Sequence, residues 1–306
     1  MKKVFIDGSA GTTGLRIRER LSSRGEITLI SLPEALRKDP AARKDAMNQA
    51  DIVFLCLPDG AALEAAQWIE NPNTAVIDTS TAHRTAEGWV YGLPELTGQE
   101  QIAGARRIAN PGCHASGFIA LVAPLVRQGV ISPDALLSCF CVTGYSGGGK
   151  KMIAEYEAQG RDPLLDAPRQ YALGQGHKHL KEMKKQTGLA NPPVFSPIVA
   201  DFYSGMEMTV PLFAQTLRAG AEEIRDIYRS TYTGKLIHFD EDPAEGGFLS
   251  AAAFSGRDDM QLTVTGNDER LLLVARYDNL GKGASGAAIQ NMNLLLGLSP
   301  TEGLIY

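Results

Sequence analysis

The first 112 residues alternate short apolar segments with amphipathic ones, and this alternation restricts the fold more than any other feature of the sequence. Strand-like and helix-like patterns follow one another in the way that is typical of a parallel sheet covered by helices. We therefore predict an α/β domain with a doubly wound sheet. The predicted strands are residues 4–7, 27–32, 51–57 and 75–79, and the predicted helices are residues 15–24, 39–47 and 61–69.

The loop between the first predicted strand and the first predicted helix has a glycine at every third position. This spacing differs from the usual G-x-G-x-x-G, but glycines in such a loop allow a tight turn, a close approach to a pyrophosphate and close packing of helix on strand. The pyrophosphate would lie at the helix N-terminus. The position of the loop predicts a Rossmann-type dinucleotide site. Its expected residues are Gly8, Ser9, Ala10, Gly11, Thr12, Thr13 and Gly14.

The end of the second predicted strand bears on the choice between NAD and NADP. An acidic residue there would bind the ribose 2′-hydroxyl of NAD. The segment Ile30-Ser31-Leu32-Pro33 offers none, and Glu34 lies slightly beyond it. We therefore predict NADP as the cofactor. Ser31, Arg37 and Arg43 are candidates for binding the 2′-phosphate, and the alternative for both arginines is an ordinary solvated position.

Two further segments follow predicted strands at the edge where open α/β sheets bind ligands. Leu57 and Pro58 come after the third strand, and Ser80 comes after the fourth. We expect these three residues to contact the cofactor. Arg84, four residues further on, is a candidate for an anionic group of the substrate. The alternative for both segments is simple turn chemistry.

Composition excludes several classes of protein. A chain of 306 residues exceeds what one hydrophobic core usually supports, so we expect two domains. The net charge of −5 comes from acidic and basic residues without long runs, which argues against nucleic-acid or membrane partners. No segment predicts a signal peptide or a membrane span, so we expect a cytoplasmic protein. Four cysteines without C-x-x-C spacing fit neither a zinc site nor a disulfide scaffold, and we predict reduced thiols.

One of the cysteines, Cys113, follows the turn-forming sequence Asn110-Pro111-Gly112 and precedes a long apolar run over residues 115–126. A helix in this run would direct its free N–H groups and its dipole toward the sulfur. Such a position favours a thiolate and predicts a nucleophile. The alternative is a small buried hydrophobic residue, which is our prediction for Cys56, Cys139 and Cys141.

Beyond Cys113 the pattern indicates a second α/β domain with longer, antiparallel strands, predicted at residues 136–143, 206–211, 261–266 and 271–277, and a helix at 221–232. After the first of these strands we predict a flexible cationic loop over residues 144–151, with Lys150 available to a phosphate or carboxylate.

His177 and His179 are expected on one side of an extended segment, with Glu182 able to orient one of them. No third ligand accompanies them, so we predict an acid/base role and no metal site. The alternative is two solvated histidines on a loop.

Five segments together resemble the N-acetyl-γ-glutamyl-phosphate reductases, in particular their shorter, type 2 branch. They are Gly8 to Gly14, Asn110 to Cys113, Ser146 to Lys150, His177 to Glu182 and Asp278 to Gly286. The resemblance covers nearly the whole chain. Two residues depart from the family pattern: His114 follows the cysteine where an aromatic or small residue is usual, and Ser116 replaces a common threonine.

The resemblance implies the architecture of glyceraldehyde-3-phosphate dehydrogenase and its phosphorylating relatives. Residues 1–112 and 280–306 would form the dinucleotide-binding domain, with the last helix, residues 284–296, packed on it, and residues 113–279 an α+β domain for substrate binding and dimerisation. Ser146, Gly147 and Asn279 would contact the cofactor, with Asn279 at the nicotinamide carboxamide. The chain would form a dimer or tetramer.

The chemistry implied is the attack of the Cys113 thiolate on an acyl phosphate, release of phosphate and reduction of the thioester by NADPH. Either His177 or His179 would transfer the proton. Two other hypotheses remain open: an aspartate-semialdehyde dehydrogenase with the same chemistry, and a dinucleotide-sensing protein without catalysis.

Overall fold

The structure is a computed structural model that describes residues 1–306. The chain divides into two compact units. The first unit comprises Met1–Gly112 and Ala284–Leu304, and the second comprises Cys113–Gly283 with the last two residues, Ile305 and Tyr306. Residues 280–283 and 305–306 therefore make their contacts with the second unit.

The first unit contains a six-stranded sheet in the order β2-β1-β3-β4-β6-β5, and every pair in it is parallel. The predicted doubly wound α/β fold is confirmed, with boundaries that differ by a few residues. The strands are β1 (Lys2–Asp7), β2 (Ile27–Ile30), β3 (Ile52–Leu55), β4 (Ala75–Asp78), β5 (Val90–Tyr91) and β6 (Arg107–Ala109). The helices are α1 (Thr12–Ser22), α2 (Pro40–Gln49), α3 (Asp59–Gln67), α4 (Pro94–Thr97), α5 (Gln99–Ala103) and α10 (Gly286–Leu295), with a 3-10 turn, η1 (Glu34–Leu36).

Alternation along the strands separates two hydrophobic clusters, one on each face of this sheet. On β1, Val4 and Ile6 belong to one cluster while Phe5 belongs to the other. The first cluster packs against α1 and α10, and the second against α2 and α3. Because neighbouring side chains of a strand point to opposite faces, helices are needed on both sides to bury them.

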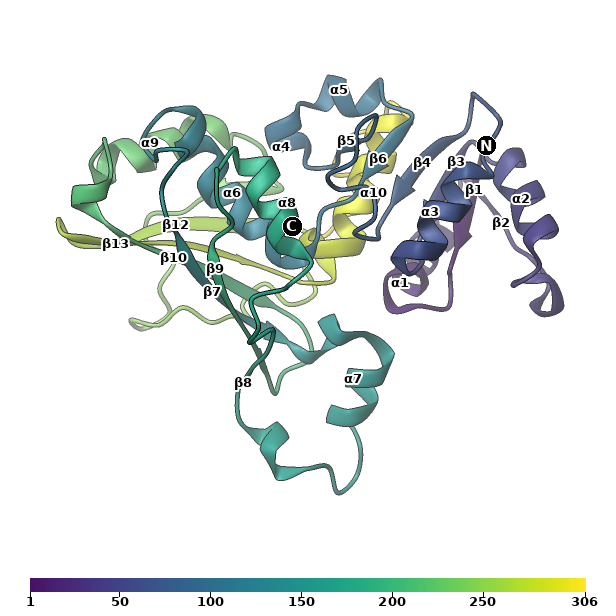
Figure 1. Ribbon diagram of the computed structural model, residues 1–306. Coiled ribbons are helices and arrows are strands. Elements are labelled where there is room, and N and C mark those ends of the chain that lie inside the picture. Colours follow the sequence, from purple (N-terminus) through teal and green to yellow (C-terminus); the bar gives the residue numbers. More distant parts are fainter. The chain divides into compact units, whose positions relative to one another are not determined.

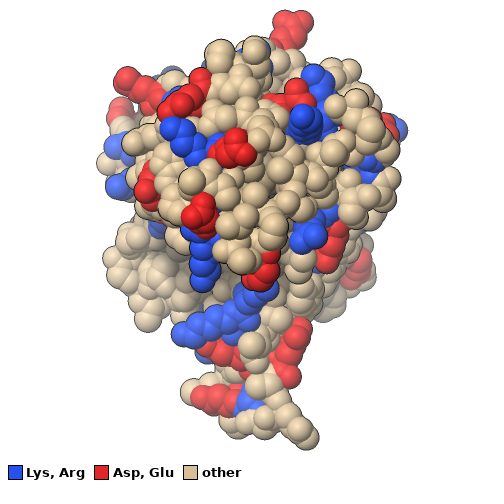
Figure 2. All heavy atoms as spheres, turned by 90° about the vertical axis from the view of Figure 1, so that its right-hand side faces the viewer, with Lys and Arg blue, Asp and Glu red and all other residues tan.

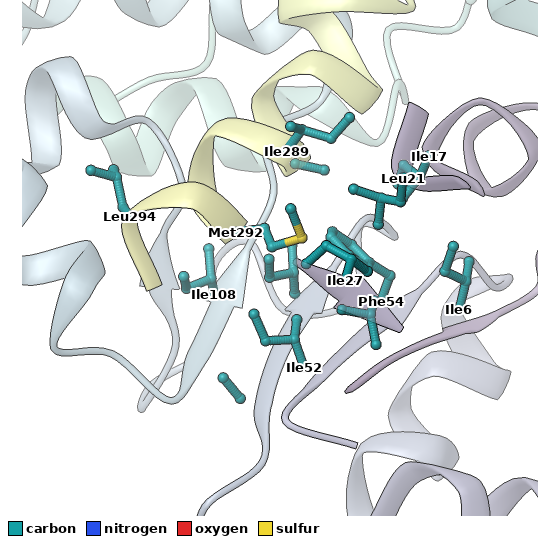
Figure 3. Packing of buried hydrophobic residues seen from close by; sticks show 14 of the residues in the cluster. Ile6, Ile17, Leu21, Ile27, Ile52, Phe54, Ile108, Ile289, Met292 and Leu294 are labelled. Carbon is teal, nitrogen blue, oxygen red and sulfur yellow. The ribbon is translucent and has the colours of Figure 1, made fainter. Parts of the chain in front are cut away.

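Helix α10 is separated from β1 by almost the whole sequence, yet it completes the core of the first unit. Ile289 and Met292 are at most 1% exposed and lie in the same cluster as Ile17 of α1 and Phe54 of β3 (Figure 3). The prediction that the last helix packs on the first domain is confirmed.

The second unit contains a mixed seven-stranded sheet in the order β11-β12-β13-β10-β7-β9-β8. Its centre is antiparallel, as predicted, but β7 pairs with β9 and β11 with β12 in parallel. The strands are β7 (Ser138–Gly144), β8 (Arg169–Gln170), β9 (Val194–Ala200), β10 (Met206–Phe213), β11 (Ile237–Phe239), β12 (Met260–Gly266) and β13 (Arg270–Tyr277). The helical segments are α6 (Cys113–Arg127), α7 (Gly149–Tyr156), α8 (His179–Thr187), α9 (Ala221–Thr231), η2 (Tyr145–Gly148), η3 (Pro163–Asp166), η4 (Ala214–Thr216) and the π-helical η5 (Gly281–Ser285).

Two local predictions in this unit were wrong. The segment 144–151 is not a flexible loop: it forms η2 and the first turn of α7. His177 and His179 do not share an extended strand, because His179 is the first residue of α8. In both places a short polar sequence with glycine or lysine gave no periodicity from which a helix start could be recognised.

Helices cover only one face of the seven-stranded sheet (Figure 1). Helix α6 packs on β10 and β13, and α9 packs on β11 and β12. On the other face, three apolar side chains of β7, β10 and β13 are exposed by 38–61%: Phe140, Phe213 and Leu272. This face has no helix against it.

The remaining expectations from composition concern charge, membranes and cysteines. Basic and acidic side chains are interspersed over the face that Figure 2 shows, without a large area of one sign. No helix has the length and apolar character needed to cross a membrane. The four cysteines are all free of disulfide bonds in the structure.

Candidate active site

Cys113 is the first residue of α6, as the sequence predicts. The helix is buried from His114 to Leu125, because almost every side chain of this run is apolar and packs against the sheet, α8 or α9. Cys113 itself is half-buried. The thiol therefore lies where the first turn of a helix has N–H groups without intrahelical partners, and these groups favour negative charge.

A tyrosine that sequence reasoning missed holds the first turn of α6. The hydroxyl of Tyr277 donates to the Cys113 carbonyl at 2.6 Å and accepts from the Gly117 N–H at 3.2 Å. A Cβ on Gly117 would lie 2.6 Å from this hydroxyl, so only glycine leaves room for it. Gly283 packs equally closely, since a Cβ there would lie 3.0 Å from the Cys113 Cβ. Nothing in the local sequence indicates either contact.

The turn that leads into α6 is fixed by hydrogen bonds within the first unit. The Asn110 N–H donates to the Asp78 carbonyl at 2.8 Å, and its side-chain amide donates to the Ala284 carbonyl at 3.0 Å. Arg84 donates to the Asn110 carbonyl at 2.8 Å and to the Thr79 carbonyl at 3.0 Å. Arg84 is 7% exposed. Its two hydrogen bonds link the loop after β4 to the turn before α6.

Three histidine rings form a cluster beside α6. The ring centroid of His114 lies 5.6 Å from that of His177 and 5.6 Å from that of His179, and the last two lie 4.7 Å apart. His114 and His179 are buried, whereas His177 is partly exposed. The structure thus brings the two predicted histidines together and adds His114, which the sequence marked only as a departure from the family pattern.

Burial keeps two of these rings uncharged, those of His114 and His177. It lowers the pKa of His114 to about 3, with a smaller contribution from neighbouring His177. It also lowers the pKa of His177 to about 4, assisted by the charge of Lys178. The Nδ1 atom of His177 accepts a hydrogen bond from the His179 backbone N–H at 3.2 Å, so the neutral ring carries its proton on Nε2. His177 is therefore a neutral ring that presents an N–H.

The predicted dinucleotide loop has the shape of a phosphate cradle. A Cβ on Gly8 would lie 2.2 Å from the Cys56 carbonyl oxygen, and one on Gly14 would lie 2.5 Å from the Gly8 carbonyl oxygen, so neither position accepts a side chain. Gly11 is the N-cap of α1, and Thr12 and Thr13 form its first turn. The exposed backbone N–H groups at this helix start suit a pyrophosphate.

Next to the loop lies a cavity of about 900 Å³, within the first unit. Five residues expected to bind the cofactor line it: Gly8, Ser9, Ala10, Ser31 and Leu57. Its size and position at the carboxyl ends of β1 and β2 fit an adenosine group.

Four cations line this cavity, and they differ in their partners. Arg43 forms an ion pair with the buried Asp7 at 2.7 Å, and Arg37 forms one with Glu34 at 2.5 Å. Arg18 on α1 and Lys38 after η1 have no acidic partner. Of these four cations, the sequence predicts only the two paired arginines as ligands of the 2′-phosphate. It does not indicate the two unpaired cations, because pairing depends on side chains far apart in the sequence.

The other predicted site residues have definite places. The side chain of Ser80 is bound to Asp78 at 2.7 Å, and Pro58 is the N-cap of α3. The Asn279 amide donates to the Ser146 hydroxyl at 3.0 Å and accepts from the Gly205 N–H at 2.9 Å, which brings two predicted cofactor residues together. Gly147 and Lys150 are exposed, with Lys150 in the first turn of α7.

The remaining cysteines are poor nucleophiles. Burial raises the pKa of Cys56 and of Cys139 to about 12, and it raises the pKa of Cys141 well above its usual value. Thiols that stay protonated are inert. Cys113 is thus the one cysteine at a helix start, and no group of three or more metal-ligating side chains is placed to hold an ion.

Comparisons with known proteins agree with this arrangement. Residues 113–279 match the family described as semialdehyde dehydrogenase, dimerisation domain, and residues 13–105 match semialdehyde dehydrogenase, NAD binding domain. The chain is 46% identical to N-acetyl-gamma-glutamyl-phosphate reductase 2 of Nostoc sp., with 99% of each chain covered. It is 44% identical to the protein of the same name from Pseudomonas putida, with 98% of each covered. The chain belongs to the N-acetyl-γ-glutamyl-phosphate reductase family.

Solved structures of more distant proteins share the fold of this reductase. Aspartate semialdehyde dehydrogenase II from Vibrio cholerae aligns with a TM-score of 0.71 at 18% identity, over 97% of this chain and 99% of that one. The aspartate semialdehyde dehydrogenase with NADP from Candida albicans aligns with a TM-score of 0.64 at 17% identity, over 97% and 98%. The predicted architecture, a Rossmann-type domain with an α+β domain, is confirmed. The reductase is an oxidoreductase whose cofactor is a nicotinamide dinucleotide.

The uncharged ring of His114 predicts how the stability of the protein depends on pH. In the unfolded chain a histidine takes up a proton near pH 6.5, whereas His114 stays neutral to about pH 3 in the fold. Between these values the unfolded state binds more protons, so the free energy of unfolding falls as the pH is lowered from about 6.5 to 4. We expect His114→Phe to reduce this slope, measured by urea unfolding at several pH values. The control His238→Phe, at a partly exposed histidine outside the cluster, should not reduce it. An equal slope in both variants would contradict the prediction.

Proposed function

We propose that the protein reduces N-acetyl-γ-glutamyl phosphate to N-acetylglutamate 5-semialdehyde and phosphate with NADPH, in arginine biosynthesis. The observation that carries the proposal is Cys113, a half-buried thiol at the first turn of α6 beside the cluster of three histidines. The names and near full-length identity of the relatives support the substrate. Each name belongs to the relative that carries it. An assay with N-acetylglutamate semialdehyde tests whether this chain has the same activity.

In the proposed reaction the Cys113 thiolate attacks the acyl carbon, phosphate leaves and a thioester forms. The developing oxyanion is stabilised by backbone N–H groups at the first turn of α6. The dinucleotide, when bound, supplies the hydride that reduces the thioester. The resulting thiohemiacetal collapses to the aldehyde and returns the thiol. Tyr277 keeps the first turn in place by its bonds to Cys113 and Gly117.

We assign to His177, rather than to His179, the hydrogen bond to the oxygen of the thiohemiacetal. His177 is partly exposed, and its Nε2–H can donate to this oxygen while the ring keeps its proton and stays neutral. His179 is 5% exposed, and its backbone N–H orients the ring of His177. Glu182 is buried in the same helix and stays a candidate for orienting the histidines.

The cofactor assigned here is NADP. Residues Gly8 to Gly14 would hold the pyrophosphate, and Leu57, Pro58, Ser80, Ser146, Gly147 and Asn279 stay assigned to the rest of the cofactor. For the 2′-phosphate we now favour Arg18 and Lys38, because a cation without an acidic partner can bind phosphate without giving up an ion pair. Ser31 lines the same cavity and can add a hydroxyl.

The substrate anions are assigned to Lys150 and Arg84. Lys150 is exposed in the first turn of α7, where a cation is free to meet a phosphate or carboxylate. Arg84 already donates to two carbonyls, so its role includes holding the turn before Cys113.

We also propose that the protein is a homo-oligomer that uses the helix-free face of the seven-stranded sheet. Phe140, Phe213 and Leu272 are exposed on this face. An exposed apolar group of this kind on a sheet is typical of a protein interface. Residues 113–279 match a family described as a dimerisation domain, which supports an interface formed by the second unit.

The first prediction concerns the reaction and its nucleophile. With N-acetylglutamate semialdehyde and phosphate, the purified protein should reduce NADP, and omission of phosphate should abolish turnover. Cys113→Ser should lower kcat by orders of magnitude while NADP binding, measured by titration, is retained, because a hydroxyl forms no comparable anion at neutral pH. Cys139→Ser is the control and should keep the rate. Preference for aspartate semialdehyde would favour the alternative dehydrogenase, and full activity of Cys113→Ser would refute the assignment of the nucleophile.

The second prediction concerns cofactor choice. Arg18→Ala and Lys38→Ala should each raise the KM for NADP about ten-fold, since a hydrogen bond to a charged phosphate is lost, while the KM for NAD changes little. Arg16→Ala, on the same helix but outside the cavity, is the matched control. Steady-state kinetics with NADP and with NAD measure these changes in KM. Equal kcat/KM for NADP and NAD in the wild-type protein would overturn the assignment of NADP.

The third prediction separates the two histidines. His177→Asn should lower kcat by about 10²- to 10⁴-fold, whereas His179→Asn should cost less, because its backbone N–H remains. Below about pH 4 a second proton on the His177 ring would occupy Nδ1 and break its bond from the His179 N–H, so the rate should fall as the pH drops through about 4, and His177→Asn should lose this limb. Chelators should leave the rate unchanged. A larger loss in His179→Asn would reverse the assignment.

A further inference from the structure

The residue after the nucleophile makes a contact that the proposed reaction does not yet use. The Nε2 atom of His114 lies 2.6 Å from the hydroxyl of Tyr171. The His114 ring is 3% exposed, and its Nδ1 atom is buried without a hydrogen-bond partner. Tyr171 follows β8 directly, and its N–H donates to the Pro197 carbonyl at 3.1 Å, so the backbone of this tyrosine is fixed to β9.

The unpartnered Nδ1 decides where the ring of His114 carries its proton. A proton on Nδ1 would be a buried N–H without an acceptor, which native proteins avoid. A proton on Nε2 meets the Tyr171 oxygen. Charge on the whole ring is disfavoured, because burial lowers the pKa of His114 to about 3. His114 is therefore a neutral ring that donates to Tyr171.

Tyr171 then accepts with its oxygen and keeps its own proton for another acceptor. The structure has no second hydrogen bond at this hydroxyl. The Tyr171 ring is partly exposed, and its centroid lies 6.0 Å from that of His177. Burial and the nearby Cys113 raise the pKa of Tyr171, so the hydroxyl stays protonated and can donate.

Other tyrosines that contact α6 show that this arrangement is unusual in the molecule. The hydroxyls of Tyr228, Tyr232 and Tyr277 donate to the carbonyls of Leu121, Ala120 and Cys113, each at 2.6 Å. Each of these donors is satisfied by the backbone of the helix. Tyr171 contacts a residue of the same helix but leaves its O–H proton unused.

We propose that the Tyr171 hydroxyl, oriented by His114, donates a hydrogen bond to an oxygen of the acyl substrate bound at Cys113. The ligand is thus a small acyl compound with a carbonyl or carboxylate oxygen within reach of the first turn of α6. Tyr171 contacts the substrate, and His114 is a positioning residue. The inference rests on the proposed function, because it assigns the hydroxyl to the substrate of that reaction.

The test begins with Tyr171→Phe, which removes only the hydroxyl. With N-acetylglutamate semialdehyde as the probe, kcat/KM should fall about ten-fold or more, while the KM for NADP is unchanged. His114→Phe should cause a loss of similar size, and the double variant should lose no more than the larger single loss, since the two residues act as one unit. His114→Gln should recover part of the activity, because a glutamine amide can place an N–H near the position of Nε2.

Tyr228→Phe is the matched control, since it removes a tyrosine hydroxyl that is bonded to α6 away from Cys113. It should lower the Tm and leave the kinetics unchanged. Wild-type kinetics in Tyr171→Phe, or losses that add in the double variant, would overturn the inference while the proposed function stands. A wild-type protein without turnover would overturn both.

Discussion

The burial of α6 is the constraint on which the catalytic half of this protein depends. Its side chains from His114 to Leu125 are buried, so the helix has one position against β10 and β13, and its first residue, Cys113, is fixed with it. Helix α8 packs on the same helix and brings His177 and His179 to its start. A nucleophile placed by an apolar helix needs few polar contacts of its own. The hydrophobic effect thus supplies the positioning on which the proposed chemistry relies.

Around the start of α6, polar groups fix the positions of their neighbours. Tyr277 bridges the Cys113 carbonyl and the Gly117 N–H, and the glycine leaves the space for its hydroxyl. His114 and His177 stay neutral, which avoids the cost of an unpaired charge in an apolar surrounding. A neutral ring with a fixed tautomer can donate a hydrogen bond over a wide pH range. The ring of His177 therefore suits hydrogen-bond donation to a developing oxyanion, whereas the three histidines are not placed so that they could hold a metal ion together.

Much of the fold could be predicted because its signals are local. Alternating strands and helices gave the first sheet, glycine spacing gave the dinucleotide loop, and the apolar run after Gly112 gave α6 with Cys113 at its start. The segment around Lys150 and the start of α8 at His179 were predicted incorrectly, since short polar sequences carry no periodicity. The cations of the cofactor cavity were missed for another reason. A cation is available to a phosphate only if no acidic side chain pairs with it, and this decides between Arg37, Arg43, Arg18 and Lys38. Arg43, for example, is paired with Asp7 of strand β1.

The sequence alone determined the two kinds of architecture, the family and the position of the proposed nucleophile at a helix start, because strand and helix periodicity, glycine spacing and a cysteine after a turn are properties of neighbouring residues. Only the tertiary structure decided what surrounds that nucleophile. Tyr277 and Gly283 reach Cys113 from the far end of the chain, and Tyr171 meets His114 across 57 residues. Burial and the distances between distant segments decide which histidine is accessible, which cations are unpaired and which hydroxyl keeps its proton. Those quantities arise only when the chain packs, and no spacing in the sequence encodes them.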